Sequence, residues 1–325
     1  MFAAVIPEVL AKYGITFVSI GNVQKGYRNE SYAVQTTGGD IVNLIFFKNE
    51  PAILERITRA DHASGVLGAT MPVRVRHDPR LLKVKDGVYA GLYTYLPGTT
   101  VPWEAYTKKH IKLTGFAMAD MHRLWRTAIP ADAHTIGDDV LPLIGRMERY
   151  FEQTDVQAAM IAKLDVRLDP RHFPAFTQLV HRVLQLPGQQ IIHMDMVRGN
   201  VLFRESQAGD RWSIDDLSLS GVIDFEKSTV GHPAFDVART LAFLLVDSPK
   251  PPSKIYHYFL DSGYRKRGGG IMFDPELLTA LIKLFLVHDF YKFLRHTPYE
   301  SLHENRHYIR TRDILQTYGM IYTIE

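Results

Sequence analysis

The sequence predicts an α+β protein with an antiparallel, five-stranded N-terminal lobe that carries one long helix, followed by a largely helical C-terminal lobe. The first hundred of the 325 residues are mostly short β-rich stretches separated by Gly, Asn and Asp turns, whereas most of the remainder has helical periodicity. A chain of this length with 46% hydrophobic residues can build a core in each of two lobes. We expect the lobes to span residues 1–97 and 98–325.

The strands of the N-terminal lobe are predicted from runs of β-forming residues that end at turn residues. These runs cover 16–23, 31–35, 41–47, 81–84 and 88–95. Pro51 begins the one helical stretch, 52–67, in which Ile53 and Ile57 share a face. The pattern therefore indicates a sheet with a single helix inserted after its third strand.

The chain changes character after Leu96-Pro97-Gly98 and becomes mainly helical. Apolar residues at helical spacing predict helices over 107–125, 138–150, 171–186, 235–246, 275–295 and 304–318. Among them lies a predicted hairpin, with strands at 201–203 and 219–223.

Composition excludes several classes of protein. The 22% charged residues leave a net charge of only +3, which is too diffuse to indicate nucleic-acid binding. Without cysteine the chain has neither disulfides nor a thiolate zinc site. The first residues lack a basic region, and the longest apolar run, 241–246, is too short to cross a bilayer. We therefore expect a cytoplasmic protein with no nucleic-acid or membrane partner.

The most informative motif is segment 193–200, which reads His-Met-Asp-Met-Val-Arg-Gly-Asn, followed 29 residues after its aspartate by Ile-Asp-Phe-Glu. Phosphoryl transfer needs a carboxylate that orients the attacking hydroxyl and oxygen ligands that hold Mg²⁺ on the phosphates. Asp195 is the candidate for the first role, and Asn200 and Asp224 are the candidates for the second. The alternative is a pair of polar loops with this spacing by chance.

Other residues near these motifs have two interpretations each. Arg198 is a candidate for neutralising γ-phosphate charge, or else a solvent-facing side chain. For His193 we favour a structural role that braces the loop over a catalytic one, and for Asp236 a buried cap of its helix over substrate binding. Glu226 is a candidate for contact with a second metal ion or a cationic substrate, or a surface residue.

Three further segments accompany these motifs: Gly-Tyr-Arg-Asn-Glu-Ser-Tyr at 26–32, Leu-Thr-Gly-Phe-Ala-Met-Ala-Asp-Met-His at 113–122, and Gly-His-Pro-Ala-Phe-Asp-Val-Ala at 231–238. With them the chain resembles the aminoglycoside phosphotransferase-like superfamily over nearly its whole length. The resemblance implies a bilobal, protein-kinase-like fold and a small-molecule kinase that uses ATP and Mg²⁺. Arg before the catalytic aspartate and Ala-Pro-Glu after Asp224 are both absent, which argues against a regulated protein kinase.

The resemblance also implies a set of nucleotide contacts. No Gly-x-Gly-x-x-Gly occurs near residue 26, so the backbone around Gly26 and Asn29 would cover the phosphates. Lys48 is the candidate for the phosphate-binding lysine, although a shifted register would put Leu44 there. Glu55 is its candidate partner, with Asp61 behind it, or else an exposed carboxylate on the helix face. The remaining nucleotide contacts are a hinge pair that would flank adenine, Tyr93 and Tyr95, whose alternative is core packing.

The function that these expectations describe is ATP-dependent transfer of a γ-phosphoryl group to a hydroxyl of a small metabolite. The acceptor classes left open are amino alcohols, homoserine-like amino acids, sugars and aminoglycosides. Two alternatives come from other classes: a nucleotide-binding pseudokinase that serves as a scaffold, and a metal-dependent hydrolase. A hydrolase would need neither Asn200 nor the strand-rich N-terminal lobe.

Overall fold

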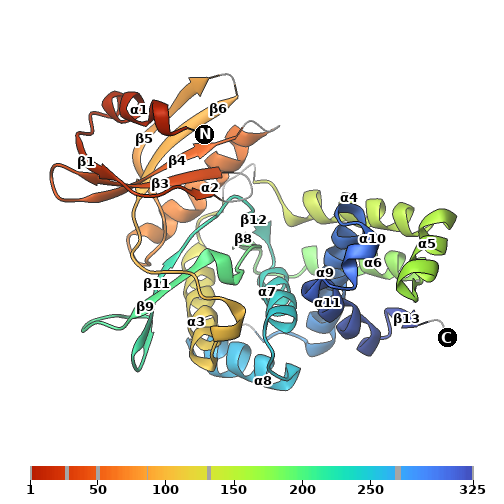
Figure 1. Ribbon diagram of the computed structural model, residues 1–325. Helices are drawn as coiled ribbons and strands as arrows, with labels where there is room; N and C mark the ends of the chain where they lie inside the picture. The colour runs from red at the N-terminus through yellow and green to blue at the C-terminus, as the bar shows by residue number, and fades with distance from the viewer. Residues whose placement is uncertain are drawn as a thin grey trace. The chain divides into compact units, whose positions relative to one another are not determined.

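The computed structural model describes residues 2–25, 29–48, 52–85, 87–129, 133–267 and 272–323. The chain forms two compact units, shown as ribbons in Figure 1. The first unit contains Met1–Thr100, Asn200–Glu205 and Ser220–Lys227, and the second contains Val101–Gly199, Ser206–Leu219 and Ser228–Glu325.

The first unit is built on an antiparallel sheet with the strand order β1-β3-β4-β6-β5. These strands are β1 (Phe17–Ile20), β3 (Asn29–Thr36), β4 (Ile41–Phe47), β5 (Arg76–Lys85) and β6 (Val88–Thr94). The five predicted strands are therefore present, with shifted ends. A sixth strand, β2 (Gln24–Lys25), pairs with β3 and was not predicted. Two residues are too short a run to show a period.

Each face of this sheet is covered by one helix. On one face Leu44 and Phe46 of β4 pack with the short helix α1 (Ile6–Lys12), which the sequence analysis missed. On the other face Ile45 and Phe47 pack with Ile53 and Ile57 of the predicted helix α2 (Ile53–Gly68). Alternate side chains of β4 thus pack into the two hydrophobic cores on either side of the sheet, since successive side chains of a strand point to opposite faces.

The predicted hairpin forms as β9 (Val201–Glu205) and β11 (Leu217–Val222), with the short strand β10 (Ser213–Ile214) beside β11. The end of β11 is hydrogen-bonded to the segment before β5, because the Val222 N–H donates to the Pro72 carbonyl over 2.9 Å. The Arg74 N–H in turn donates to the Val222 carbonyl over 3.1 Å. Asn200–Glu205 and Ser220–Lys227 therefore group with the first hundred residues, while the expected boundary at residue 97 remains a prediction.

The second unit is mainly helical. Its helices are α3 (Lys108–Trp125), α4 (Ile136–Phe151), α5 (Thr154–Leu164), α6 (Phe173–Leu184), α7 (Pro233–Asp247), α8 (Pro252–Tyr256), α9 (Pro275–His296), α10 (Tyr299–Leu302) and α11 (Arg306–Thr317). Two antiparallel strand pairs accompany them: β8 (Gln190–Ile192) with β12 (Thr229–Gly231), and β7 (Val166–Leu168) with β13 (Ile321–Thr323). The six predicted helices are present, and α5 is the longest one that was missed, since it buries only one residue per turn.

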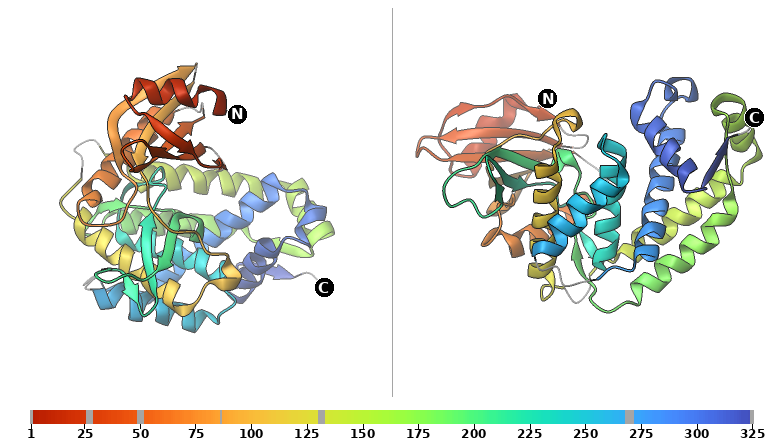
Figure 2. Two further views of the ribbon diagram at one scale, coloured as in Figure 1. Left: turned by 60° about the vertical axis from the view of Figure 1, so that its left-hand side comes forward. Right: turned by 90° about the horizontal axis from the view of Figure 1, so that it is seen from below.

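Helix α7 lies at the centre of this unit. It packs against α9, and the two are seen side by side in Figure 1 and in the right-hand view of Figure 2. A second close approach involves α3, where a Cβ on Gly115 would lie 2.5 Å from the Phe259 carbonyl oxygen. Glycine at 115 therefore lets α3 pack directly on the π-helical segment His257–Tyr264.

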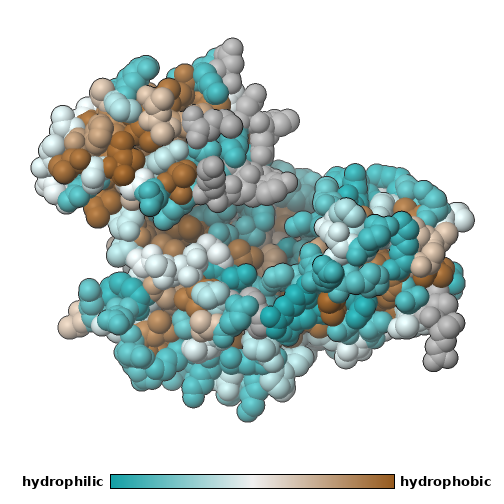
Figure 3. All heavy atoms as spheres, in the orientation of Figure 1, coloured by the Kyte–Doolittle hydropathy of each residue, from teal (hydrophilic) through white to brown (hydrophobic). Residues whose placement is uncertain are grey.

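No described helix is long and apolar enough to cross a membrane. Figure 3 shows hydrophilic and hydrophobic residues mixed over the visible face of each unit.

Candidate active site

The loop that carries Asp195 follows β8 in the second unit, and Asp236 of α7 holds its backbone in place. The N–H of His193 donates to Asp236 Oδ2 over 2.8 Å, and the N–H of Met194 donates to Oδ1 over 2.9 Å. The sequence analysis expected Asp236 to cap its own helix, and this expectation was wrong. His232 is the N-cap, and its Nδ1 accepts the Ala234 N–H. Asp236 lies in the first turn, from which its side chain reaches the loop.

Asp236 is the centre of a buried polar network. His122 Nε2 lies 3.0 Å from Asp236 Oδ2, and His122 Nδ1 lies 2.8 Å from the Tyr264 hydroxyl. Burial raises the pKa of Asp236, but the hydrogen bond and charge of His122 outweigh it, so the pKa lies below the usual value. The aspartate is therefore an anion fully paired inside the protein, as buried charges must be.

Asp195 itself is 7% exposed. Its N–H donates to His193 Nδ1 over 3.2 Å, and its carbonyl accepts the Val197 N–H over 2.7 Å. The preceding residue, Met194, has φ = 62°, a left-handed conformation that is uncommon for a non-glycine residue. The backbone on both sides of Asp195 is thus held by several hydrogen bonds. His193 has the bracing contacts that the sequence analysis favoured.

Arg198 turns toward the C-terminal end of α7. Its Nε lies 3.4 Å from Asp247 Oδ2, while Asp247 Oδ1 lies 3.2 Å from His307 Nδ1. The same carboxylate and guanidinium line a small pocket, whose other walls are Tyr106, Met196, Phe243, Leu244 and Ser248. The pocket therefore combines apolar walls with one anion and one cation. Two of its residues, Met196 and Arg198, follow Asp195 closely in the chain. The sequence analysis missed Asp247, since a carboxylate at a helix end has no motif.

Asp224 and Asn200 belong to the first unit. Asp224 is exposed and has φ = 64°, and the N–H of its neighbour Ile223 donates to the Asn200 carbonyl over 3.0 Å. The two predicted metal ligands are thus joined through one backbone hydrogen bond. Among the described residues no group of three or more His, Cys, Asp or Glu side chains could hold a metal ion. Mg²⁺ does not need such a group, because it takes one or two protein ligands beside waters and phosphates.

Glu226 contacts the first residue of β3. Asn29 Nδ2 donates to Glu226 Oε1, and Arg56 Nε of α2 lies 3.8 Å from Oε2. The structure thus brings Asn29 next to the Asp-Phe-Glu segment, two residues after Asp224. Gly26 lies outside the described residues. The sequence analysis missed Arg56, which occupies the turn of α2 after Glu55.

The remaining predicted nucleotide contacts lie in different settings. Lys48 is partly buried at the end of β4, Glu55 is exposed on α2, and the two form no ion pair. The helix points Ile53 and Ile57 at the sheet, so Glu55 faces away from it. Tyr93 is buried and donates from its hydroxyl to Asp61 Oδ1 over 3.2 Å, whereas Tyr95 is 37% exposed. Glu55 is thus an exposed carboxylate on the helix face, the alternative that the sequence analysis left open, and the nucleotide roles of these residues remain predictions.

Comparisons with known proteins agree with this arrangement. A family model described as the phosphotransferase enzyme family matches residues 19–267. The chain is 27% identical to homoserine kinase of Granulibacter bethesdensis over 236 residues, which cover 71% of this chain and 67% of the relative. It is 26% identical to homoserine kinase of Xanthobacter autotrophicus over 258 residues, or 73% and 68% of the two chains.

Solved structures show the same fold at low sequence identity. Amicoumacin kinase hAmiN, in complex with AMP-PNP, Ca²⁺ and Ami, superposes with a TM-score of 0.69 at 13% identity, over 97% of this chain and 94% of that one. Macrolide 2'-phosphotransferase MphH from Brachybacterium faecium superposes with a TM-score of 0.59 at 16% identity, over 96% and 98%. The predicted protein-kinase-like α+β fold is confirmed. The family match covers more than half of the chain, so this protein belongs to the phosphotransferase enzyme family and is a small-molecule kinase.

Proposed function

We propose that the protein transfers the γ-phosphoryl group of ATP to a hydroxyl group of a small metabolite in the cytoplasm. The observation that carries this proposal is the loop at Asp195, whose backbone is bonded to the buried Asp236 anion on one side and to His193 on the other. A fixed carboxylate of this kind suits an acceptor hydroxyl that must be oriented for in-line attack.

The roles of the residues follow from their chemistry. Asp195 hydrogen-bonds the acceptor hydroxyl and accepts its proton as the new O–P bond forms. Asn200 and Asp224 would hold Mg²⁺ against the nucleotide phosphates, where the ion neutralises the charge of the transferring group. In the first unit, the backbone near Asn29 and the hinge formed by β6 and the following Tyr95 would bind the rest of the nucleotide.

For the acceptor we propose an amino-bearing metabolite, with L-homoserine as the first candidate. The pocket beside Arg198 and Asp247 supports this choice, because a carboxylate can recognise an ammonium group and a guanidinium can recognise a carboxylate. Its apolar walls would pack against the short carbon chain. Both curated relatives are named homoserine kinases, which points to the same class.

The test is release of ADP from Mg-ATP in the presence of single acceptors. The panel contains L-homoserine, choline, ethanolamine, a hexose and kanamycin, and GTP replaces ATP in a parallel series. We expect ADP release that requires an acceptor and disappears in the Asp195→Asn variant. Acceptor-independent ADP release would indicate hydrolysis, and nucleotide binding without any turnover would favour the pseudokinase alternative.

A further inference from the structure

In many phosphotransferases a cationic side chain contacts the nucleotide phosphates, and the resemblance predicts this charge at the end of β4. The strand does not supply it. Leu44 and Phe46 lie in the apolar core under α1, and Ile45 and Phe47 lie in the apolar cluster with α2. Lys48 follows only after the strand has ended. The face of β4 that meets α2 therefore carries no lysine, and Ile53 and Ile57 of α2 pack against its apolar residues.

Arg74 reaches this same face of β4 from another segment. It lies between α2 and β5, and its N–H is bonded to the Val222 carbonyl, two residues before Asp224. Its Nε donates to the side-chain oxygen of Asn43 over 3.2 Å when that amide is oriented with its oxygen toward the guanidinium. Asn43 precedes Ile45 by two positions and is buried, so Arg74 is anchored on the face of β4 that meets α2, opposite the face of Leu44 and Phe46.

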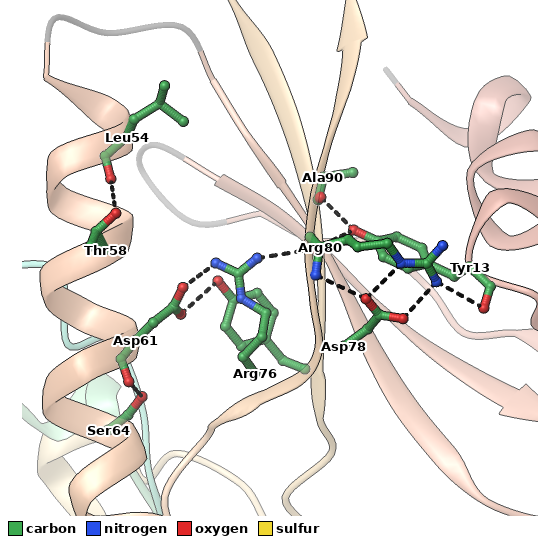
Figure 4. Close-up of polar contacts among 10 residues, drawn as sticks. Tyr13, Leu54, Thr58, Asp61, Ser64, Arg76, Asp78, Arg80 and Ala90 are labelled. Atoms are coloured by element: carbon green, nitrogen blue, oxygen red, sulfur yellow. Dashed lines mark hydrogen bonds and ion pairs between the residues drawn. The ribbon is translucent and has the colours of Figure 1, made fainter.

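Arg74 lies near the predicted metal ligand Asp224, whose charge acts on it. Burial lowers the pKa of Arg74 to about 10, and the charge of Asp224 acts in the opposite direction. The guanidinium therefore remains protonated at neutral pH and interacts electrostatically with the carboxylate of Asp224, the predicted metal ligand. Among the described residues Arg74 forms no ion pair, whereas Arg76 is bonded to Asp61 and Arg80 to Asp78, as Figure 4 shows.

We propose that Arg74 supplies the phosphate-binding positive charge that β4 does not. The proposal rests on the proposed ATP-dependent function and extends it to a residue outside the family-like motifs. A guanidinium suits this position, because its planar fork can donate two hydrogen bonds to phosphate oxygens and it is more weakly hydrated than an ammonium group. Its anchor on Asn43 orients the fork before the nucleotide arrives.

The test is equilibrium binding of ADP and of adenosine in the presence of Mg²⁺, measured by titration calorimetry on the whole protein. Arg74→Gln removes the charge but keeps a donor for Asn43, Arg74→Lys keeps the charge, and Lys48→Met removes the competing cation. Arg80→Met is the control, since it removes an arginine of the same unit whose charge is already paired with Asp78. Thermal melting of each variant checks that it is folded.

We expect Arg74→Gln to weaken ADP binding at least tenfold while adenosine binding changes less than twofold. Arg74→Lys should retain most of the ADP affinity, and Lys48→Met and Arg80→Met should each change it less than threefold. Unchanged ADP binding in a folded Arg74→Gln variant would overturn the inference, and so would an equal loss of adenosine binding or a tenfold loss in Lys48→Met. If Arg74→Gln does not fold, Arg74→Lys decides. A tenfold loss of ADP affinity in Arg74→Lys with unchanged adenosine binding would still support a phosphate contact. Unchanged ADP binding in Arg74→Lys, together with weaker ADP binding in Lys48→Met, would overturn it. Wild-type protein that binds neither ADP nor ATP would overturn the proposed function and this inference with it.

Discussion

The carboxylate of Asp236, in the first turn of α7, accepts the backbone N–H of Met194 over 2.9 Å, one residue before Asp195. A second bond from the His193 N–H and a contact with His122 complete the shell of this buried anion. The orientation of Asp195 is thus fixed by a residue 41 positions later in the chain, through backbone bonds that no sequence pattern at 193–200 specifies.

Asp236→Asn should both destabilise the protein and slow turnover. An amide presents one N–H₂ group where the aspartate has two accepting oxygens, so one of the buried donors loses its partner. Breaking a buried, paired charge costs about 3 kcal/mol. Urea denaturation and the kcat for ADP release would measure the two effects. The matched control is Asp169→Asn, whose carboxylate pairs with the exposed Arg171, and we expect it to change stability by less than about 1 kcal/mol.

Asp195→Asn should reduce kcat about a hundredfold or more while the melting temperature and the affinity for ADP stay close to those of wild type. Asparagine fills the same space but cannot accept the proton of the acceptor hydroxyl. Single-turnover kinetics with saturating Mg-ATP would measure the effect. Asp216→Asn, at an exposed carboxylate bonded to Lys109, should leave kcat unchanged. A near-normal rate in Asp195→Asn would remove Asp195 from the mechanism.

Asp224→Asn should raise the concentration of Mg²⁺ needed for half-maximal nucleotide binding. The change replaces one anionic oxygen ligand with a neutral one, and asparagine tolerates the left-handed backbone at this position. Asp215 provides a matched control, because it is also an exposed aspartate with positive φ, at 54°. ADP titrations at several Mg²⁺ concentrations should separate the two variants. Equal Mg²⁺ dependence in both would contradict a metal role for Asp224.

Asp247→Asn should raise the KM for an ammonium-bearing acceptor about tenfold, with a smaller effect on the KM for ATP. The reason is that Asp247 is the anion of the proposed acceptor pocket. Asp261→Asn is the control, since Asp261 also contacts one arginine and one histidine, Arg265 and His257, but lies outside the pocket. Steady-state kinetics with L-homoserine would test both variants. A KM for L-homoserine that is the same in both would locate acceptor recognition elsewhere.

His110 should make the stability of the protein depend on pH. Burial, together with the nearby charges of Lys250 and Lys109, lowers the pKa of His110 from 6.5 to about 4. Its unprotonated Nδ1 accepts the Thr107 N–H at the start of α3, so the folded protein holds the neutral form. Between pH 6.5 and about 4 the unfolded chain therefore binds a proton that the folded chain does not, and stability falls as the pH decreases through this window.

The measurement for His110 is the free energy of unfolding of wild type and of His110→Gln at several values of pH. Glutamine also completes a capping box but does not titrate. We expect the stability of wild type to fall more steeply than that of the variant from pH 6.5 toward pH 4. Parallel curves for the two proteins would show that His110 carries no such linkage.

The order of the elements could be predicted from local patterns. The strands of the first unit and the longest helices of the second were recognised because their side chains repeat at the period of the element, as in β4 and α2. The candidate catalytic and metal residues, Asp195, Asn200 and Asp224, could be named because their chemistry requires fixed spacing on short loops. Elements with too few buried residues to show a period, such as β2 and α5, were missed for the same physical reason.

Only the tertiary structure decided which of these residues have partners distant in the chain. The bonds of Asp236 to the loop at Met194, the contact of Arg198 with Asp247 and the position of Arg74 on the face of β4 all join segments more than thirty residues apart. Such contacts depend on which faces of packed helices and strands meet, because a side chain's neighbours in space are set by packing and not by its own spacing. The sequence by itself determined which residues are candidates for the chemistry, because their types and spacing are local. Packing determined which distant side chains contact those residues and position them.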